Sequence, residues 1–221
     1  ASDLPSPRNL APGLSTAGTA VPNCAGMDPT SPRTFDWTLM EDGTADDYLE
    51  SIATFKRHVH DSLTDHLFGL LRSMEGPRFG YQVDRYRHSL QSASRALRNG
   101  EDTEMVVAAL LHDVGDMVAP ANHSAVAADI IKPYVSDRTH WIIRHHGVFQ
   151  GYYYFHHLGG DRDAREAFRE HQWFDDCSAF CHEYDQNCFD PAYDDLPLEE
   201  FRPLAEEVFR RPSRFEMVVL A

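Results

Sequence analysis

The sequence lacks long apolar runs and an excess of basic residues. None of its apolar runs approaches the roughly 18 residues that a membrane-spanning helix needs. Lysine and arginine total 20 of the 221 residues against 35 acidic residues, which gives a formal net charge of -15. A chain this acidic repels phosphate backbones and anionic lipids. We therefore expect neither a membrane nor nucleic acid as a partner, whereas a small anionic substrate is not excluded.

Cysteine is scarce as well. Three of the four cysteines, Cys177, Cys181 and Cys188, lie close together in the sequence, and Cys24 stands alone. None of them has an obvious disulfide partner, which is typical of proteins in the reducing cytosol. We expect a cytoplasmic protein in which the clustered thiols are small apolar core residues. A zinc site is the alternative, but the C-x-x-C spacing of a zinc knuckle is missing.

The first part of the chain lacks apolar periodicity. Residues 1–34 are rich in Pro, Ser, Thr, Ala and Gly. Such a segment buries too little apolar surface to offset the entropy lost when it becomes ordered. It also lacks the basic start and apolar centre of a secretory signal. The sequence therefore predicts a flexible N-terminal leader at 1–34 and one domain at 35–221.

The remainder of the chain lacks the alternation with period two that marks a half-buried strand. Apolar residues recur instead at helical spacing from Thr44, a good N-cap, to a stop at Gly76-Pro77. Further predicted helices cover roughly 83–98, 102–114, 122–134, 137–157, 161–170, 174–185 and 198–210. The linkers between several of them are short, which indicates an all-α fold and a compact helical bundle.

Histidine, in contrast, is abundant, with 13 residues. In MVVAALLHDVGD, a mostly apolar stretch leads directly into His112 and Asp113. Burying both side chains without partners would cost several kcal/mol, so something must compensate for their burial. A divalent metal would do so, since imidazole and carboxylate are both metal ligands and a carboxylate can bridge two ions. Taken alone, the dipeptide also fits a helix C-terminus followed by a capping aspartate.

Three further histidines and one aspartate share this setting. Each lies within, or at the edge of, an otherwise apolar helical face: His88, His123, His146 and Asp185. Together with the His-Asp dipeptide, they would give each of two ions three protein ligands if Asp113 bridges them. The remaining coordination positions would be open to water, oxygen or substrate, as in catalytic rather than structural metal sites.

This ordered set resembles the H…HD…H…H…D motif of the HD superfamily, over about residues 80–190. The resemblance implies six metal ligands on a helical HD-domain bundle. In chain order they are His88, the pair His112 and Asp113, the middle histidines His123 and His146 of the dinuclear branch, and Asp185.

Within the superfamily, the chain looks closer to the mixed-valent di-iron oxygenases than to the phosphohydrolases. The run His88-Ser89-Leu90-Gln91 and the spacing from the HD pair to the middle histidines resemble the phosphonate-cleaving oxygenases, whose branch includes myo-inositol oxygenase. The resemblance implies two iron ions (Fe2+/Fe3+), with Mn2+ or another divalent metal as the alternative. It implies that O2 is used to cleave a C–C or C–P bond of a small hydroxylated substrate. A metal-dependent HD phosphohydrolase, acting on a small phosphoester or nucleotide, remains the alternative because it needs the same six ligands.

Two positions depart from the phosphonate-cleaving oxygenases. Asp116 follows the motif aspartate by three residues, where several relatives have Lys or His, and we expect it to hydrogen-bond a ligand histidine. Gln150 follows the last histidine by four residues, where those oxygenases tend to have a cation for the phosphonate. Its neutral amide favours a polyol, amino alcohol or hydroxy compound over a strongly anionic substrate.

Aromatic residues supply the other candidates for substrate contact. Tyr153 lies on the helical face next to His146 and could form a pocket wall, although aromatic residues more often serve packing. Tyr81 lies in a loop before the first ligand, where related oxygenases carry a substrate-gating lid; a plain turn is the alternative. His145 points about 100° away from its neighbour on a helix, and we expect it outside the site.

Overall fold

The structure is a computed structural model that describes residues 33–215. It divides into two compact units, with the boundary after Glu50. All but the last two residues of the predicted leader lie outside the described residues, as does Cys24, so the leader remains a prediction. Within the described part, no helix combines the length and the apolar character needed to cross a membrane.

The first unit begins helix α1 (Ala45–Arg72), after a short 3-10 helix η1 (Met40–Asp42). The start of α1 is fixed by a reciprocal pair of hydrogen bonds. The Asp47 N–H donates to Thr44 Oγ1 over 3.2 Å, and the Thr44 N–H donates to Asp47 Oδ2 over 3.0 Å. This arrangement satisfies two N–H groups that a helix start leaves free, so the predicted N-cap at Thr44 is confirmed.

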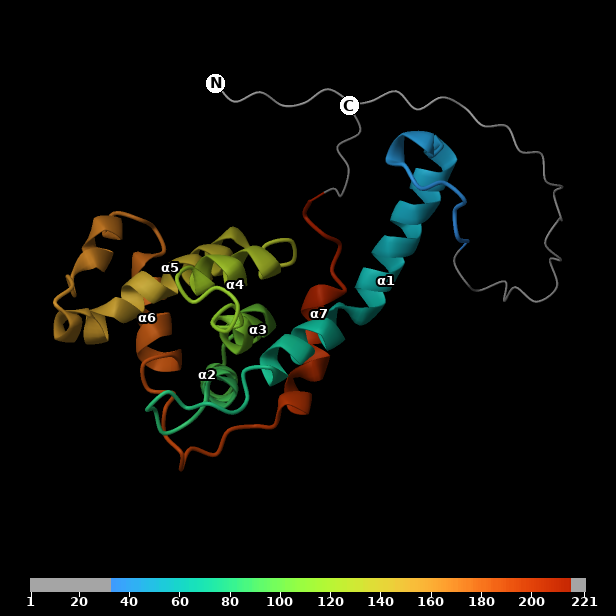
Figure 1. Ribbon diagram of the computed structural model, residues 1–221. Coiled ribbons are helices and arrows are strands. Elements are labelled where there is room, and N and C mark those ends of the chain that lie inside the picture. Colours follow the sequence, from blue (N-terminus) through green and yellow to red (C-terminus); the bar gives the residue numbers. More distant parts are fainter. Residues whose placement is uncertain (1–32, 216–221) are drawn as a thin grey trace, which may run out of the picture. The chain divides into compact units, whose positions relative to one another are not determined.

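The second unit contains the rest of α1 and six further α-helices (Figure 1). These are α2 (Arg85–Arg98), α3 (Thr103–Leu111), α4 (His123–Ile131), α5 (Asp137–Tyr154), α6 (Phe174–Tyr184) and α7 (Arg202–Phe209). Three 3-10 helices accompany them: η2 (Phe155–Leu158), η3 (Ala164–Phe168) and η4 (Leu198–Phe201). Residues 33–215 contain no strand, and the predicted all-α class is confirmed.

Helix α3 forms the centre of the core. All residues from Met105 to Leu111 are buried, and α2, α5 and α7 pack against this helix (Figure 1). On the other side of the unit, α5 packs against both α4 and α6. A helix that is apolar on every face has to be buried in this way, and each large apolar side chain that it buries contributes about 1.5–3 kcal/mol. The burial of α3 places the residues that follow it inside the protein.

Several predicted helices differ from the observed ones. The helix predicted to reach residue 134 ends at Ile131, and the one predicted from residue 198 begins as the 3-10 helix η4. The α-helix predicted to continue to residue 114 ends at Leu111, with His112 as its C-cap. The predicted helix 161–170 is the 3-10 helix η3 instead. There, the Arg165 guanidinium lies 3.7 Å from the centroid of the Tyr152 ring, so a tertiary contact competes with the local helical pattern.

The start of α3 yields a stability prediction. The Asp102 carboxylate caps α3 by accepting a hydrogen bond from the Met105 N–H over 2.8 Å. Asp102→Ala is expected to lower the free energy of unfolding by about 1 kcal/mol, the usual cost of removing an N-cap. Urea unfolding would measure it, with Asp175→Ala as the control, because that exposed carboxylate lies in the first turn of α6 without being its N-cap. Equal losses in the two variants would contradict the prediction.

Candidate metal centre

The structure brings the six predicted ligands to one place from five segments of the second unit. His88 lies on α2, His123 begins α4, and His146 lies on α5. The other three ligands lie at helix ends: His112 and Asp113 directly follow α3, and Asp185 is the C-cap of α6.

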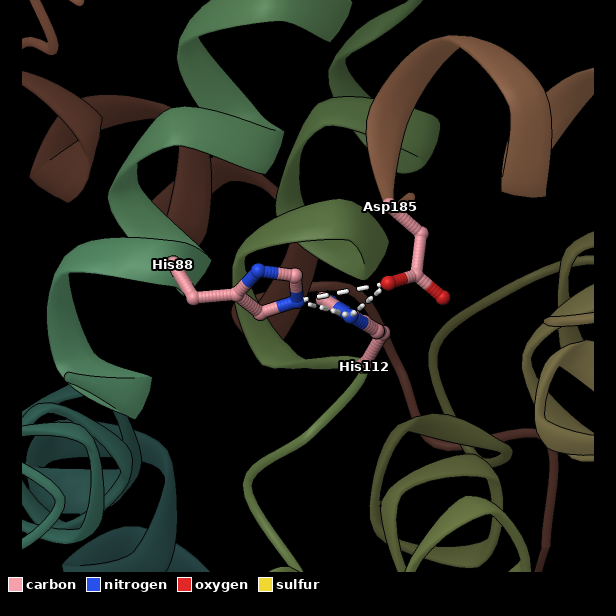
Figure 2. A group of neighbouring side chains, drawn as sticks. All are labelled: His88, His112 and Asp185. Carbon is pink, nitrogen blue, oxygen red and sulfur yellow. Dashed lines mark hydrogen bonds and ion pairs between the residues drawn. The ribbon is translucent and has the colours of Figure 1, made fainter. Parts of the chain in front are cut away.

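One group of side chains is almost entirely buried. The Nε2 atoms of His88 and His112 lie 3.2 Å apart (Figure 2). Asp185 Oδ1 lies 3.4 Å from the first of these nitrogens and 3.8 Å from the second. One atom of each residue therefore faces a common point, at separations that a single metal ion could span.

A second group lies on the other side of Asp113. Its Oδ1 is 3.2 Å from His146 Nε2 and 3.5 Å from His123 Nε2. Its Oδ2 faces the first group, at 3.4 Å from His88 Nε2 and 3.5 Å from His112 Nε2. The two oxygens of one carboxylate thus point at two different histidine pairs, which is the arrangement that a bridging ligand needs.

The hydrogen bonds of Nδ1, the second ring nitrogen of each histidine, indicate whether these residues fit a metal. All four Nδ1 atoms face a backbone carbonyl oxygen at 2.6–3.1 Å: Cys188 for His88, Ala109 for His112, Pro120 for His123 and Ile143 for His146. A carbonyl oxygen only accepts, so each Nδ1 carries a proton and each ring turns its Nε2 inward. Two inward lone pairs at 3.2 Å repel unless a proton or a metal ion lies between them. The residues fit a metal centre.

Electrostatics point in the same direction. Burial by itself lowers the pKa of His88, but Asp113 and Asp185 outweigh it and raise this pKa to about 9. Burial by itself raises the pKa of Asp185, but His112 and His88 hold it well below its usual range. The two buried carboxylates therefore stay ionised and attract positive charge, whether a proton or a metal ion supplies it.

Close backbone packing brings the second group together. A Cβ atom at Gly115 would lie 2.8 Å from the backbone oxygen of His123, so only glycine allows the turn after α3 to approach α4 this closely. Gly147 on α5 acts similarly, because its Cβ would lie 2.6 Å from Ser124 Oγ. The glycine in HDVGD is thus part of what places His123 next to Asp113.

A cavity of about 330 Å³ opens onto the centre. Four of the ligands line it, namely Asp113, His123, His146 and Asp185. The four other predicted site residues also line it, namely Tyr81, Asp116, Gln150 and Tyr153. His88 and His112 are not among its lining residues, so one histidine pair faces the cavity and the other lies behind it.

Asp116 and Gln150 each contact a predicted ligand. Asp116 Oδ1 lies 3.4 Å from His123 Nδ1, and burial and the nearby Asp113 raise the Asp116 pKa. Gln150 donates from Nε2 to Asp185 Oδ1 over 3.0 Å. Because an ionised Asp185 only accepts, this bond fixes the orientation of the amide. Gln150 Oε1 is buried and has no hydrogen-bond partner among the described residues.

The two predicted tyrosines lie at the cavity wall. The Tyr153 hydroxyl lies 3.1 Å from His182 Nδ1. Tyr81 stacks on Phe189 with ring centroids 4.7 Å apart, and 48% of its surface is exposed. Its position at the open side fits a contact with an entering ligand as well as a plain turn.

Sequence reasoning missed Arg85 and Phe189, which also line the cavity. Arg85 Nε lies 3.0 Å from Asp116 Oδ2, and its NH1 lies 3.9 Å from Asp113 Oδ2. The signal for it was in the sequence: in RYRH, an arginine precedes His88 by three positions and so shares its helical face. The neutral amide of Gln150 therefore does not leave the cavity without a cation.

Other histidines and the cysteines lie elsewhere. His145 stacks on Trp141 with centroids 4.2 Å apart and does not join the centre, as the helical geometry predicted. The three cysteines within the described residues are free and fully buried, which agrees with their predicted role as core residues.

Comparison with known protein families gives one match, over the part of the chain that carries most of the centre. Residues 85–178 match the family model described as HD domain. Over this stretch the chain is similar to an HD domain. The matched segment runs from the first residue of α2 into α6 and includes five of the six predicted ligands, with Asp185 beyond it. No curated protein matches the chain. The similarity and the groups of His and Asp side chains that could hold a metal ion point to the same part of the chain.

Proposed function

We propose that this HD-domain protein is a mixed-valent di-iron oxygenase, which uses O2 to cleave a C–C or C–P bond of a small hydroxylated substrate. One observation carries the proposal: Asp113 turns one oxygen to each of two histidine pairs, so the donor set suits two ions rather than one. The nitrogen-rich set of four imidazoles and two carboxylates suits iron, as does the resemblance of the motif spacing to the di-iron branch.

Each side chain around the cavity would have its own role in binding the metal ions or the substrate. A bound iron pair would supply redox chemistry with O2 and Lewis acidity toward a substrate hydroxyl. Gln150 Oε1, the free acceptor, would receive a hydrogen bond from a hydroxyl or ammonium group and so orient the substrate. Arg85 would hold an acidic group, and Asp116 would keep His123 oriented through its Nδ1 side. The Tyr81 and Phe189 rings would cover the substrate and limit the entry of water.

The experiment that tests this proposal is metal analysis of anaerobically purified protein, followed by EPR and O2 uptake. We expect about two iron ions per chain, given six ligands and one bridge, and the half-integer-spin signal of an antiferromagnetically coupled Fe(II)/Fe(III) pair. O2 consumption should appear with members of a panel of small hydroxylated acids, polyols and amino alcohols. Redox-silent divalent metal without O2 uptake would refute the oxygenase.

A metal-dependent phosphohydrolase is the second candidate, and two observations favour it. The HD-domain match is to a family in which phosphohydrolases are frequent, and Arg85 provides a guanidinium that pairs well with a phosphate. In that case the metals would lower the pKa of bound water to make a nucleophile. Hydrolysis of a small phosphoester or nucleotide by Mn2+-loaded protein in the absence of O2 would decide for this candidate.

Arg85 gives a prediction under either candidate. Arg85→Gln is expected to raise the KM for an acidic substrate about ten- to a hundredfold, because a hydrogen bond to a charged group contributes about 1.5–3 kcal/mol. The KM for a neutral substrate should change little. Arg98→Gln is the matched control, since Arg98 lies on the same helix but pairs with Asp194 outside the cavity. Equal KM values for the Arg85→Gln and Arg98→Gln proteins would remove Arg85 from the substrate site.

We further propose that the protein acts in the cytoplasm on a small molecule and binds neither membranes nor nucleic acid. The net charge of -15 and the three free, buried thiols support this proposal.

A further inference from the structure

The loop that follows α6 forms one wall of the metal centre. The Cys188 carbonyl oxygen lies 3.1 Å from His88 Nδ1 and accepts its proton. The neighbouring Phe189 ring stacks on the His88 imidazole, with centroids 4.5 Å apart and planes tilted by 25°. Two adjacent residues of the loop thus contact both the edge and the face of one predicted ligand. The position of this loop therefore sets the orientation of the His88 ring.

Helix α2 holds the loop with a row of polar side chains. Arg87 donates to Asp195, Arg95 donates to the Asn187 carbonyl, and Ser94 accepts from the Leu196 N–H. These contacts run along the loop from one end to the other. His88 lies on the same helix, so the helix that carries the ligand also anchors the loop that orients it.

Among these side chains of α2, Gln91 differs from the others named because it bonds to both the N–H and the carbonyl of one loop residue, Asp190. Its Nε2 donates to the Asp190 carbonyl over 2.7 Å, and its Oε1 accepts from the Asp190 N–H over 3.3 Å. The two hydrogen bonds hold the backbone of Asp190 on both sides of its Cα and so fix its position and orientation. Gln91 is fully buried, so water does not replace these bonds readily if the loop moves away.

We infer that Gln91 is a positioning residue for the metal ligand His88, acting through Asp190 and the adjoining Cys188 and Phe189. This inference rests on the metal centre of the proposed function. Hydrogen bonds to the far nitrogen of a ligand histidine fix its tautomer and ring orientation, and losing such a partner typically lowers metal affinity about 10–100-fold. Gln91 acts one step further out, so a loss of about tenfold is expected.

The test is titration of the metal-free full chain with Co(II), followed by visible absorption and by binding isotherms. Gln91→Met keeps the length of the side chain and removes both hydrogen bonds. It should weaken Co(II) binding about tenfold and change the ligand-field absorption of the bound ion. Gln91→Glu keeps the acceptor for the Asp190 N–H and loses the donor to the Asp190 carbonyl. It should also weaken Co(II) binding and change the ligand-field absorption. The absorption spectrum reports the ligand geometry, which a loss of global stability alone does not alter.

Ser94→Ala is the matched control. It removes one hydrogen bond between α2 and the same loop, over 2.9 Å, but at Leu196, away from the residues that contact His88. Its Co(II) affinity should stay within about twofold of the wild type, because the orienting partner of His88 is retained. Its spectrum should be unchanged.

Three outcomes overturn the inference, and they are distinguishable. If folded Gln91→Met or, where that variant does not fold, Gln91→Glu matches the wild type in affinity and spectrum, Gln91 does not position His88. If Ser94→Ala shifts as much as the Gln91 variants, the loop as a whole matters and Gln91 has no special part. If the wild-type protein binds no Co(II), the metal centre itself fails, and the proposed function and this inference fall together.

Discussion

Asp113→Asn is expected to remove at least one of the two metal ions and to lower turnover about a thousandfold. The carboxylate turns Oδ1 to His146 and His123 and Oδ2 to His88 and His112. An amide keeps a single acceptor oxygen and loses the negative charge, so one histidine pair is left without its oxygen ligand. Losing about 4 kcal/mol of metal-dependent stabilisation of the transition state corresponds to a thousandfold in rate. Metal content per chain and kcat measure the two effects.

The control for this variant is Asp129→Asn. Asp129 is an exposed carboxylate that lies 3.4 Å from both His140 and Arg144, away from the cavity. The Asp129→Asn protein should keep its metal and its turnover. If Asp113→Asn retains two ions per chain and full turnover, Asp113 does not bridge, and the dinuclear proposal is wrong.

The sequence was sufficient to indicate which side chains come together. Ionisable residues at the end of an apolar stretch need partners, and the ordered motif indicates which residues those partners are. The fold agrees with this: α3 is buried on every side, so His112 and Asp113 enter the interior with it. The division of the ligands into a buried and a cavity-facing group was not predictable, because it depends on which way each side chain points.

The residues that sequence reasoning missed show where it stops. Gln91 was seen only as part of a motif, and Phe189 was not seen at all. Phe189 stacks on His88 and Gln91 bonds to Asp190, and both contacts depend on a loop without regular structure. No periodicity marks such a loop. Arg85 was visible as a cation one helical turn before His88, but its place in the cavity follows from the packing of α2 against the turn after α3. Local patterns specify helices, and loop positions require the assembled fold.

Metal is expected to stabilise the protein more at pH 9 than at pH 6.5. In the metal-free fold the pKa of His88 is raised to about 9, above its ordinary value of 6.5. A proton on His88 therefore stabilises the metal-free fold below about pH 6.5, and this contribution is lost as the pH rises toward 9. Because the pKa of Asp185 is lowered, its carboxylate stays ionised and unneutralised in this range. A metal ion takes the place of this proton. At pH 6.5 the ion has to displace the proton, which weakens metal binding, whereas near pH 9 His88 is largely deprotonated and metal binding meets less competition.

Calorimetric melting with Co(II) and with a chelator, at both pH values, measures this difference. At a metal concentration of about 1,000 times Kd, the gain is about 4 kcal/mol, which corresponds to about 10 °C in Tm for a chain of this size. We expect this full gain near pH 9 and a clearly smaller one at pH 6.5. His88→Gln, which removes this titrating group and one ligand, should show a smaller gain that depends less on pH, because His112, whose pKa is also raised, remains. The same gain at both pH values in the wild-type protein would mean that no proton is held between the buried imidazoles and carboxylates. The close approach of these imidazoles and carboxylates would then need an explanation that does not involve a bound proton or metal ion.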